Sequence, residues 1–157
     1  MKENLMRENL VELLRSGHAH VNFKDAINNL KPKNRNIRPE GNLHSVWELL
    51  EHIRLAQEDI LRYTLDPKWK SPKWPDEYWP KDEGKISDEM WHNSIKKFDA
   101  DLNELIDLAK NSKIDVTSEI PHGEGRTYLR EIMMAANHNS YHVGQIVSVR
   151  KLLDNWK

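Results

Sequence analysis

Two histidines that lie four residues apart, His138 and His142, are the residues of this chain whose type and spacing most directly suggest chemistry. In an α-helix, residues four apart lie on one face, one turn from each other. Two imidazoles placed in this way can bind one metal ion. The pair shares its helical face with Ala135, Val149 and Leu153, which we expect to face the core. Polar rings are costly there unless something satisfies their nitrogen atoms.

The spacing of this pair leaves a second interpretation open. The chain holds 8 histidines in 157 residues, so a pair four residues apart is expected by chance in many chains of this composition. Both rings could then be core histidines, each hydrogen-bonded to a carbonyl or a side chain. A catalytic metal site usually has three protein ligands and one open position, so a third ligand is needed to favour metal binding.

His52 is the best candidate for that third ligand among the six other histidines. It lies in the middle of a predicted helix, at the rim of the apolar face, with Leu49, Leu55 and Ala56 beside it. A ligand at this position could point into a cleft between helices. The alternative is an ordinary histidine at a helix rim. The chain has no cysteine, which excludes disulfides, thiolate ligands and a cysteine nucleophile, so a metal site must use His, Asp or Glu.

The composition narrows the class of protein. The 24 Lys and Arg residues balance the 25 Asp and Glu residues, and no basic stripe suggests a nucleic-acid or membrane-surface partner. No run of 18 apolar residues exists, and the N-terminus lacks the apolar run of a signal peptide. We therefore expect a cytoplasmic protein with one domain, residues 1–157, which is long enough to bury a core.

Hydrophobic periodicity predicts an all-α fold, because strand signals are scarce and apolar residues recur at helical spacing. Asn22, Ser87 and Thr127 are expected N-caps. In the first helix, Leu5, Leu10, Leu13 and Leu14 form the expected apolar set. Four long helices of this kind are typical of a bundle. The expected helices cover about residues 3–14, 44–65, 88–109 and 127–153, with a short helix at 23–30.

The connection at residues 67–85 contains four prolines and three tryptophans, Trp69, Trp74 and Trp79, at five-residue intervals. A connection of this length is often functional. The favoured interpretation is that it crosses the end of the bundle and that its tryptophans fill the core, because large aromatic residues mostly serve packing. The alternative is an aromatic wall or lid over a site, and the two can hold for different tryptophans.

Four segments of the sequence, residues 44–57, 74–80, 121–131 and 137–146, resemble the DinB-like (DinB/YfiT-like) superfamily of metalloenzymes. The resemblance implies an up-down-down-up four-helix bundle in which the Trp/Pro-rich connection is the crossover between helices 2 and 3. It implies a metal triad of His52, His138 and His142 that binds a divalent ion, zinc or nickel. It also implies a homodimer, and a reaction similar to that of members that transfer groups to low-molecular-weight thiols.

Three more residues are candidates for orienting the rings or contacting a substrate. Gln145 and Glu131 lie within about 20° of His138 in a helical projection. Glu48 lies one turn before His52 and could act as a base, or could be a solvated carboxylate at the helix rim. The leading hypothesis is a metal-dependent transferase or hydrolase that acts on a small molecule. The alternatives are a non-catalytic metal-binding or stress-related interaction protein, and a metal-free bundle.

Overall fold

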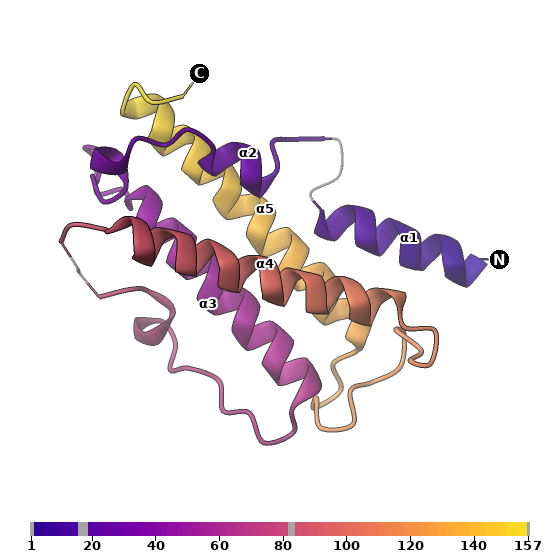
Figure 1. Ribbon diagram of the computed structural model, residues 1–157. Coiled ribbons are helices and arrows are strands. Elements are labelled where there is room, and N and C mark those ends of the chain that lie inside the picture. Colours follow the sequence, from indigo (N-terminus) through magenta and orange to yellow (C-terminus); the bar gives the residue numbers. More distant parts are fainter. Residues whose placement is uncertain (1, 16–18, 82–83, 157) are drawn as a thin grey trace.

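The computed structural model of the protein describes residues 2–15, 19–81 and 84–156 (Figure 1). This part of the chain is helical and contains no strand, apart from one isolated antiparallel bridge between Glu119 and Thr127. The expected all-α class is therefore confirmed for the described residues. The helices are α1 (Lys2–Leu14), α2 (Phe23–Ile27), α3 (Val46–Leu65), α4 (Asp88–Lys110) and α5 (Tyr128–Leu152), with 3-10 turns η1 (Pro32–Asn34) and η2 (Asp76–Tyr78).

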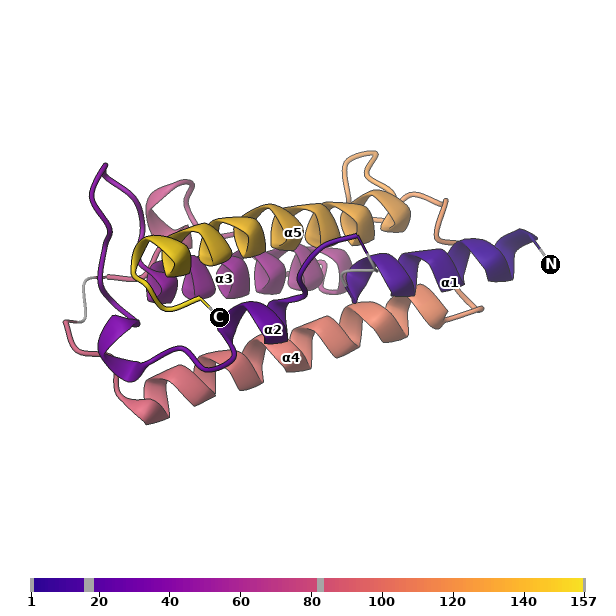
Figure 2. The ribbon, with the colours of Figure 1, turned by 90° about the horizontal axis from the view of Figure 1, so that it is seen from above.

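The four long helices pack along one another, and the short α2 packs on α5. Helix α3 contacts both α4 and α5, and α1 contacts α4 and α5. In both ribbon views, α3 and α4 run in one direction and α1 and α5 run in the other (Figures 1 and 2). The connection between α3 and α4 therefore returns along the molecule, and it carries η2 beside α3. None of the helices in the described ranges is long and apolar enough to cross a membrane.

The helix starts follow from their capping residues. Asn22, Ser87 and Thr127 each accept a hydrogen bond from a backbone N–H in the first turn, as predicted. Helix α3 starts at Val46, two residues later than expected, because Ser45 is its N-cap. Ser45 Oγ accepts from the Glu48 N–H at 3.1 Å, and the Glu48 carboxylate accepts from the Ser45 N–H at 2.8 Å. This reciprocal pair is a capping box, which fixes the start of the helix that carries His52.

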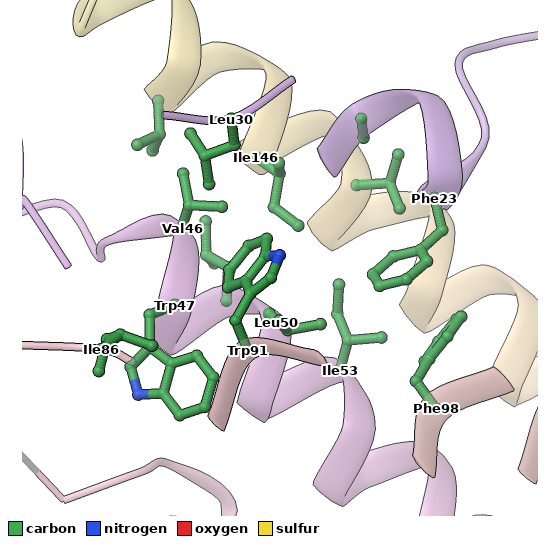
Figure 3. Packing of buried hydrophobic residues seen from close by; sticks show 14 residues of the cluster. Phe23, Leu30, Val46, Trp47, Leu50, Ile53, Ile86, Trp91, Phe98 and Ile146 are labelled. Atoms are coloured by element: carbon green, nitrogen blue, oxygen red, sulfur yellow. The ribbon is translucent and has the colours of Figure 1, made fainter. Parts of the chain in front are cut away.

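Two hydrophobic clusters form the core. The first lies around the N-terminal halves of α3 and α4 and the C-terminal half of α5, where Trp47 and Trp91 lie near each other (Figure 3). The second lies between α1, the C-terminal half of α4 and the N-terminal half of α5. Apolar residues that recur at helical spacing on α3 and α4, such as Leu49, Ile53, Trp91 and Phe98, are buried. The two clusters therefore pack α3 against α5 on both sides of the histidines along the helix axes.

The prediction for α1 was wrong for Leu5 and Leu13, whose side chains are 59% and 43% exposed. Val11 and Arg7 are buried instead. The Arg7 guanidinium donates to the carbonyl oxygen of Ala109, at the C-terminal end of α4, at 3.0 Å. A cation is favoured where a helix end leaves carbonyls without partners. Arg7 therefore shares the buried face of α1 with Leu10, Val11 and Leu14, and Leu5 and Leu13 lie outside it.

Candidate metal centre

Helices α3 and α5 bring His52, His138 and His142 together. The ring centroids lie 4.9 Å apart for His52 and His138, 4.5 Å for His52 and His142, and 4.5 Å for His138 and His142. One nitrogen of each ring lies within 4.8 Å of the others. Within the described ranges this is the group of three side chains with a geometry that could hold a metal ion. The two helices thus assemble, from segments 86 residues apart, the cluster that the sequence suggested.

Two of the three rings have a fixed proton position. His52 Nδ1 lies 2.8 Å from the carbonyl oxygen of Tyr78, and His142 Nδ1 lies 2.7 Å from Gln145 Oε1. Both partners are acceptors, so each ring carries its proton on Nδ1 and donates it. The Nε2 atoms of His52 and His142 therefore each carry a lone pair that can accept a hydrogen bond or bind a metal. A metal-bound imidazole usually has this arrangement, with one nitrogen on the metal and the other donating to a protein acceptor.

The third ring, His138, shows why the cluster fits a cation. Its Nε2 lies 3.2 Å from His52 Nε2, and because His52 Nε2 is an acceptor, His138 Nε2 must donate in the metal-free protein. His138 Nδ1 is then an acceptor. It is buried and finds no hydrogen-bond partner among the described residues. Buried polar atoms without partners are rare in folded proteins, so the metal-free triad leaves one nitrogen unsatisfied.

The spacing of the nitrogen atoms suits a transition metal. Two nitrogens bound to one tetrahedral zinc at about 2.0–2.1 Å lie about 3.3 Å apart. The distance between His138 Nε2 and His52 Nε2 is 3.2 Å, which already matches that edge. The wider separations, up to 4.8 Å, would have to shorten by up to about 1.5 Å. Rotations of the rings about their side-chain bonds can supply this movement.

Burial keeps the rings neutral at neutral pH. Burial, together with the neighbouring His142 and His52, lowers the pKa of His138 to about 3, while the hydrogen-bonding Asn139 side chain opposes the change. Burial also lowers the pKa of His142 to about 4, against the effect of Gln145, and lowers the pKa of His52. Imidazole binds a metal only in its neutral form. The rings can therefore bind a cation at neutral pH without first losing a proton.

An aromatic wall covers one side of the triad. The Trp79 ring stacks on the His52 ring at 3.9 Å between centroids and 2° between planes, and it also stacks on His44 at 3.9 Å. Trp79 packs against the first hydrophobic cluster as well. Trp79 therefore serves both as core packing and as a wall of the site, and the two interpretations of the connection hold together for this residue.

The other two tryptophans of the connection do not fill the core. Trp74 is 68% exposed, and Trp69 is half-buried with its Nε1–H donating to Asp59 at 2.8 Å. The favoured interpretation was therefore wrong for these two. The reason is that Asp59, on α3, accepts hydrogen bonds from both Trp69 and the Tyr78 hydroxyl, at 2.6 Å for the latter. These bonds hold the connection against the side of α3 rather than inside the bundle.

The three additional candidates lie in different surroundings. Gln145 contacts His142 directly. Glu131 is buried and forms an ion pair with the adjacent Arg130. Burial raises the pKa of Glu48, but its bonds to Arg38 and to the Ser45 N–H lower it below the ordinary value. A carboxylate stabilised in its charged form is a weak base, so the contacts of Glu48 favour a role at the helix start over one in proton transfer.

The remaining described histidines do not belong to the triad. His20, His92 and His122 contact the backbone oxygens of Val21, Asp88 and Tyr63. His44 stacks on Trp79, which separates it from His52, and His18 lies outside the described residues. Sequence reasoning missed Tyr78 and Asp59. No sequence signal points to Tyr78, since a backbone oxygen makes the contact.

Residues 18–146 match the model of the DinB superfamily. This match covers most of the chain, including all three histidines of the triad and the connection that carries Trp79. No curated protein and no solved structure matches the chain significantly.

Proposed function

Because the chain belongs to the DinB superfamily and carries three histidines that could hold a metal ion, we propose that it is a metal-dependent enzyme. Its substrate is a small molecule, and its reaction is group transfer to a low-molecular-weight thiol or hydrolysis. The observation that carries this proposal is the contact of His52 Nδ1 with the Tyr78 carbonyl oxygen and of His142 Nδ1 with Gln145 Oε1, which leaves the Nε2 side of both rings toward the triad.

The donor set favours zinc or nickel. Neutral imidazoles bind late transition metals well, and three of them leave at least one position for water or substrate. When bound, such an ion supplies a Lewis acid that lowers the pKa of a water or thiol at the open position. Since the chain has no cysteine, the thiol of a transferase reaction must come from a cosubstrate.

The residues around the triad would hold and shield the reacting groups. Tyr78 and Gln145 fix the orientation of two rings through their acceptor oxygens. Trp79 excludes water from the face of His52 that it covers. Tyr141 is 64% exposed and meets the His142 ring edge-on at 4.9 Å between centroids. An exposed aromatic ring beside the triad suits contact with an apolar part of a substrate.

We further propose that α1, α3, α4 and α5 form an up-down-down-up bundle with residues 67–85 as its crossover. The directions of the helices in the ribbon views support this topology. A cytoplasmic location and a homodimer also belong to the proposal, and size-exclusion chromatography with light scattering tests the latter.

Cobalt-loaded protein tests the enzyme proposal. Cobalt(II) replaces zinc in histidine sites and gives a visible spectrum that reports on its ligands. We expect added low-molecular-weight thiol to change this spectrum, and thiol plus an alkylating electrophile to be consumed faster with the protein than without it. His142→Ala should abolish both effects. Thr64→Val, a change in α3 at a residue bonded to the Ile60 carbonyl, is the matched control.

A non-catalytic metal-binding protein is the second candidate. The face-to-face stacking of Trp79 on His52 favours it, because packing that holds a ligand ring rigidly suits an ion bound for stability or sensing. A cobalt spectrum that neither thiols nor small anions change, together with no turnover, would select this candidate and contradict the enzyme proposal.

A further inference from the structure

A chain of buried amides crosses the core beside the triad. Gln57 Nε2 donates to the carbonyl oxygen of Phe98 at 2.8 Å, and Asn139 Nδ2 donates to Gln57 Oε1 at 2.8 Å. Gln57 is 0% exposed and Asn139 is 5% exposed. A carbonyl oxygen can only accept, so it sets the orientation of Gln57, which in turn sets that of Asn139. The free end of the chain is therefore an acceptor, Asn139 Oδ1.

A second buried atom without a hydrogen-bond partner belongs to the neighbouring residue, His138. Asn139 Oδ1 and His138 Nδ1 belong to consecutive residues, and both are buried without a hydrogen-bond partner among the described residues. In the metal-free protein His138 donates from Nε2 to His52, so its Nδ1 is an acceptor. Two acceptors cannot bond to each other. The Asn139 side chain lies close enough to His138 to raise its pKa. The position of the His138 proton accounts for the missing partner of both atoms.

Metal binding removes that reason. Once His138 Nε2 is a ligand, its proton must sit on Nδ1, which then becomes a donor. We propose that Asn139, held by Gln57, is the positioning residue that accepts a hydrogen bond from His138 Nδ1 in the metal-bound protein. The inference rests on the proposed metal site, and it assigns His138 the kind of partner that Tyr78 and Gln145 give the other two rings.

The amide chain also explains how the site is kept in shape. It connects Asn139, the residue after His138 on α5, to Gln57 on α3 and to the backbone of α4 at Phe98. Each ring of the triad then has an acceptor from a different part of the fold: the connection for His52, the amide chain for His138, and the next turn of α5 for His142. The arrangement fixes all three Nε2 atoms toward one point.

Zinc affinity of variants tests this role, with Zn²⁺ alone as the probe and a competing chelator as the reference. Asn139→Leu keeps the size of the side chain and removes the acceptor, and we expect a loss of about 10–100-fold in affinity. Asn139→Asp keeps an acceptor oxygen and should retain more affinity than Asn139→Leu. Thr64→Val, which also removes a buried polar atom of the core, should bind zinc as the wild type does.

The proton position gives a second measurement, made on the wild type, which does not depend on any variant folding. In ¹⁵N-labelled protein, two-bond imidazole spectra should show His138 protonated on Nε2 without zinc and on Nδ1 with zinc. Wild-type affinity in Asn139→Leu, or a zinc-bound His138 that coordinates through Nδ1, would overturn the inference and leave the metal site standing. A wild type that binds no zinc would overturn both.

Discussion

Asp59 holds the connection in the position from which the Tyr78 carbonyl oxygen contacts His52. Replacing Asp59 should therefore weaken metal binding, although Asp59 itself does not contact the triad. Its carboxylate accepts from Trp69 Nε1 at 2.8 Å and from the Tyr78 hydroxyl at 2.6 Å. A hydrogen bond to a charged group contributes about 1.5–3 kcal/mol. With the lower value for each of the two bonds, because the partners are half-buried, Asp59→Ala should destabilise the closed conformation of the connection by about 3 kcal/mol. That energy raises the local opening constant by about two orders of magnitude.

The assay is limited proteolysis of residues 66–80 beside zinc competition, with Asp66→Ala as the control. The Asp66 side chain accepts a bond from the Lys68 N–H in the same connection, and the Trp69 N–H bonds to the Asp66 backbone oxygen, which Asp66→Ala keeps. Asp59→Ala should speed cleavage strongly and weaken zinc binding by up to about 100-fold, since His52 loses its acceptor. Bound zinc should in turn slow cleavage in the wild type. If Asp59→Ala and Asp66→Ala behave alike in both assays, the link between the connection and the ligand is wrong.

Three further predictions concern the site and the core. Gln145→Ala should weaken zinc binding by about 10–100-fold with little change in the unfolding of metal-free protein, and Gln145→Glu should restore it, as chelator competition would show. The pKa values of His138 and His142, about 3 and about 4, lie below the ordinary 6.5, so below pH about 6.5 the unfolded chain binds protons that the folded chain does not. The unfolding free energy of metal-free protein should therefore fall toward acid pH by about 1.4 kcal/mol per pH unit for each ring, and His142→Gln should reduce the slope in urea titrations; an unchanged slope would refute this. Phe98→Ala, at a fully buried position of the first cluster, should lower the unfolding free energy by about 3–5 kcal/mol in the same titration, and a loss below about 1 kcal/mol would contradict the packing.

The parts of the fold that could be predicted are those set by short-range rules. Ser87 and Thr127 start α4 and α5 where a capping side chain precedes an apolar repeat. The pairing of His138 and His142 follows from the helical period. The capping box of Ser45 and Glu48 was also within reach, because Ser-x-x-Glu before an apolar run is its usual signature. Reading that pattern would have assigned Glu48 to the helix start.

The parts that could not be predicted depend on long-range contacts. His52 is oriented by the backbone oxygen of Tyr78, 26 residues away, and backbone atoms leave no mark in the residue pattern. The burial of Arg7 in place of Leu5 follows from carbonyls at the far end of α4. The role of Asn139 depends on Gln57, a polar residue within the apolar face of α3, which only the packed core explains.

The most direct test of the central claim is the metal content of untagged protein, measured by elemental analysis for the wild type, His52→Ala and His138→Ala. The triad predicts close to one zinc or nickel ion per chain in the wild type, or on reconstitution at neutral pH, and a loss of that metal in both variants. His92→Ala, at an exposed histidine bonded to the Asp88 carbonyl, should keep it. A wild type that cannot be loaded at neutral pH, or variants that retain full metal, would contradict the account.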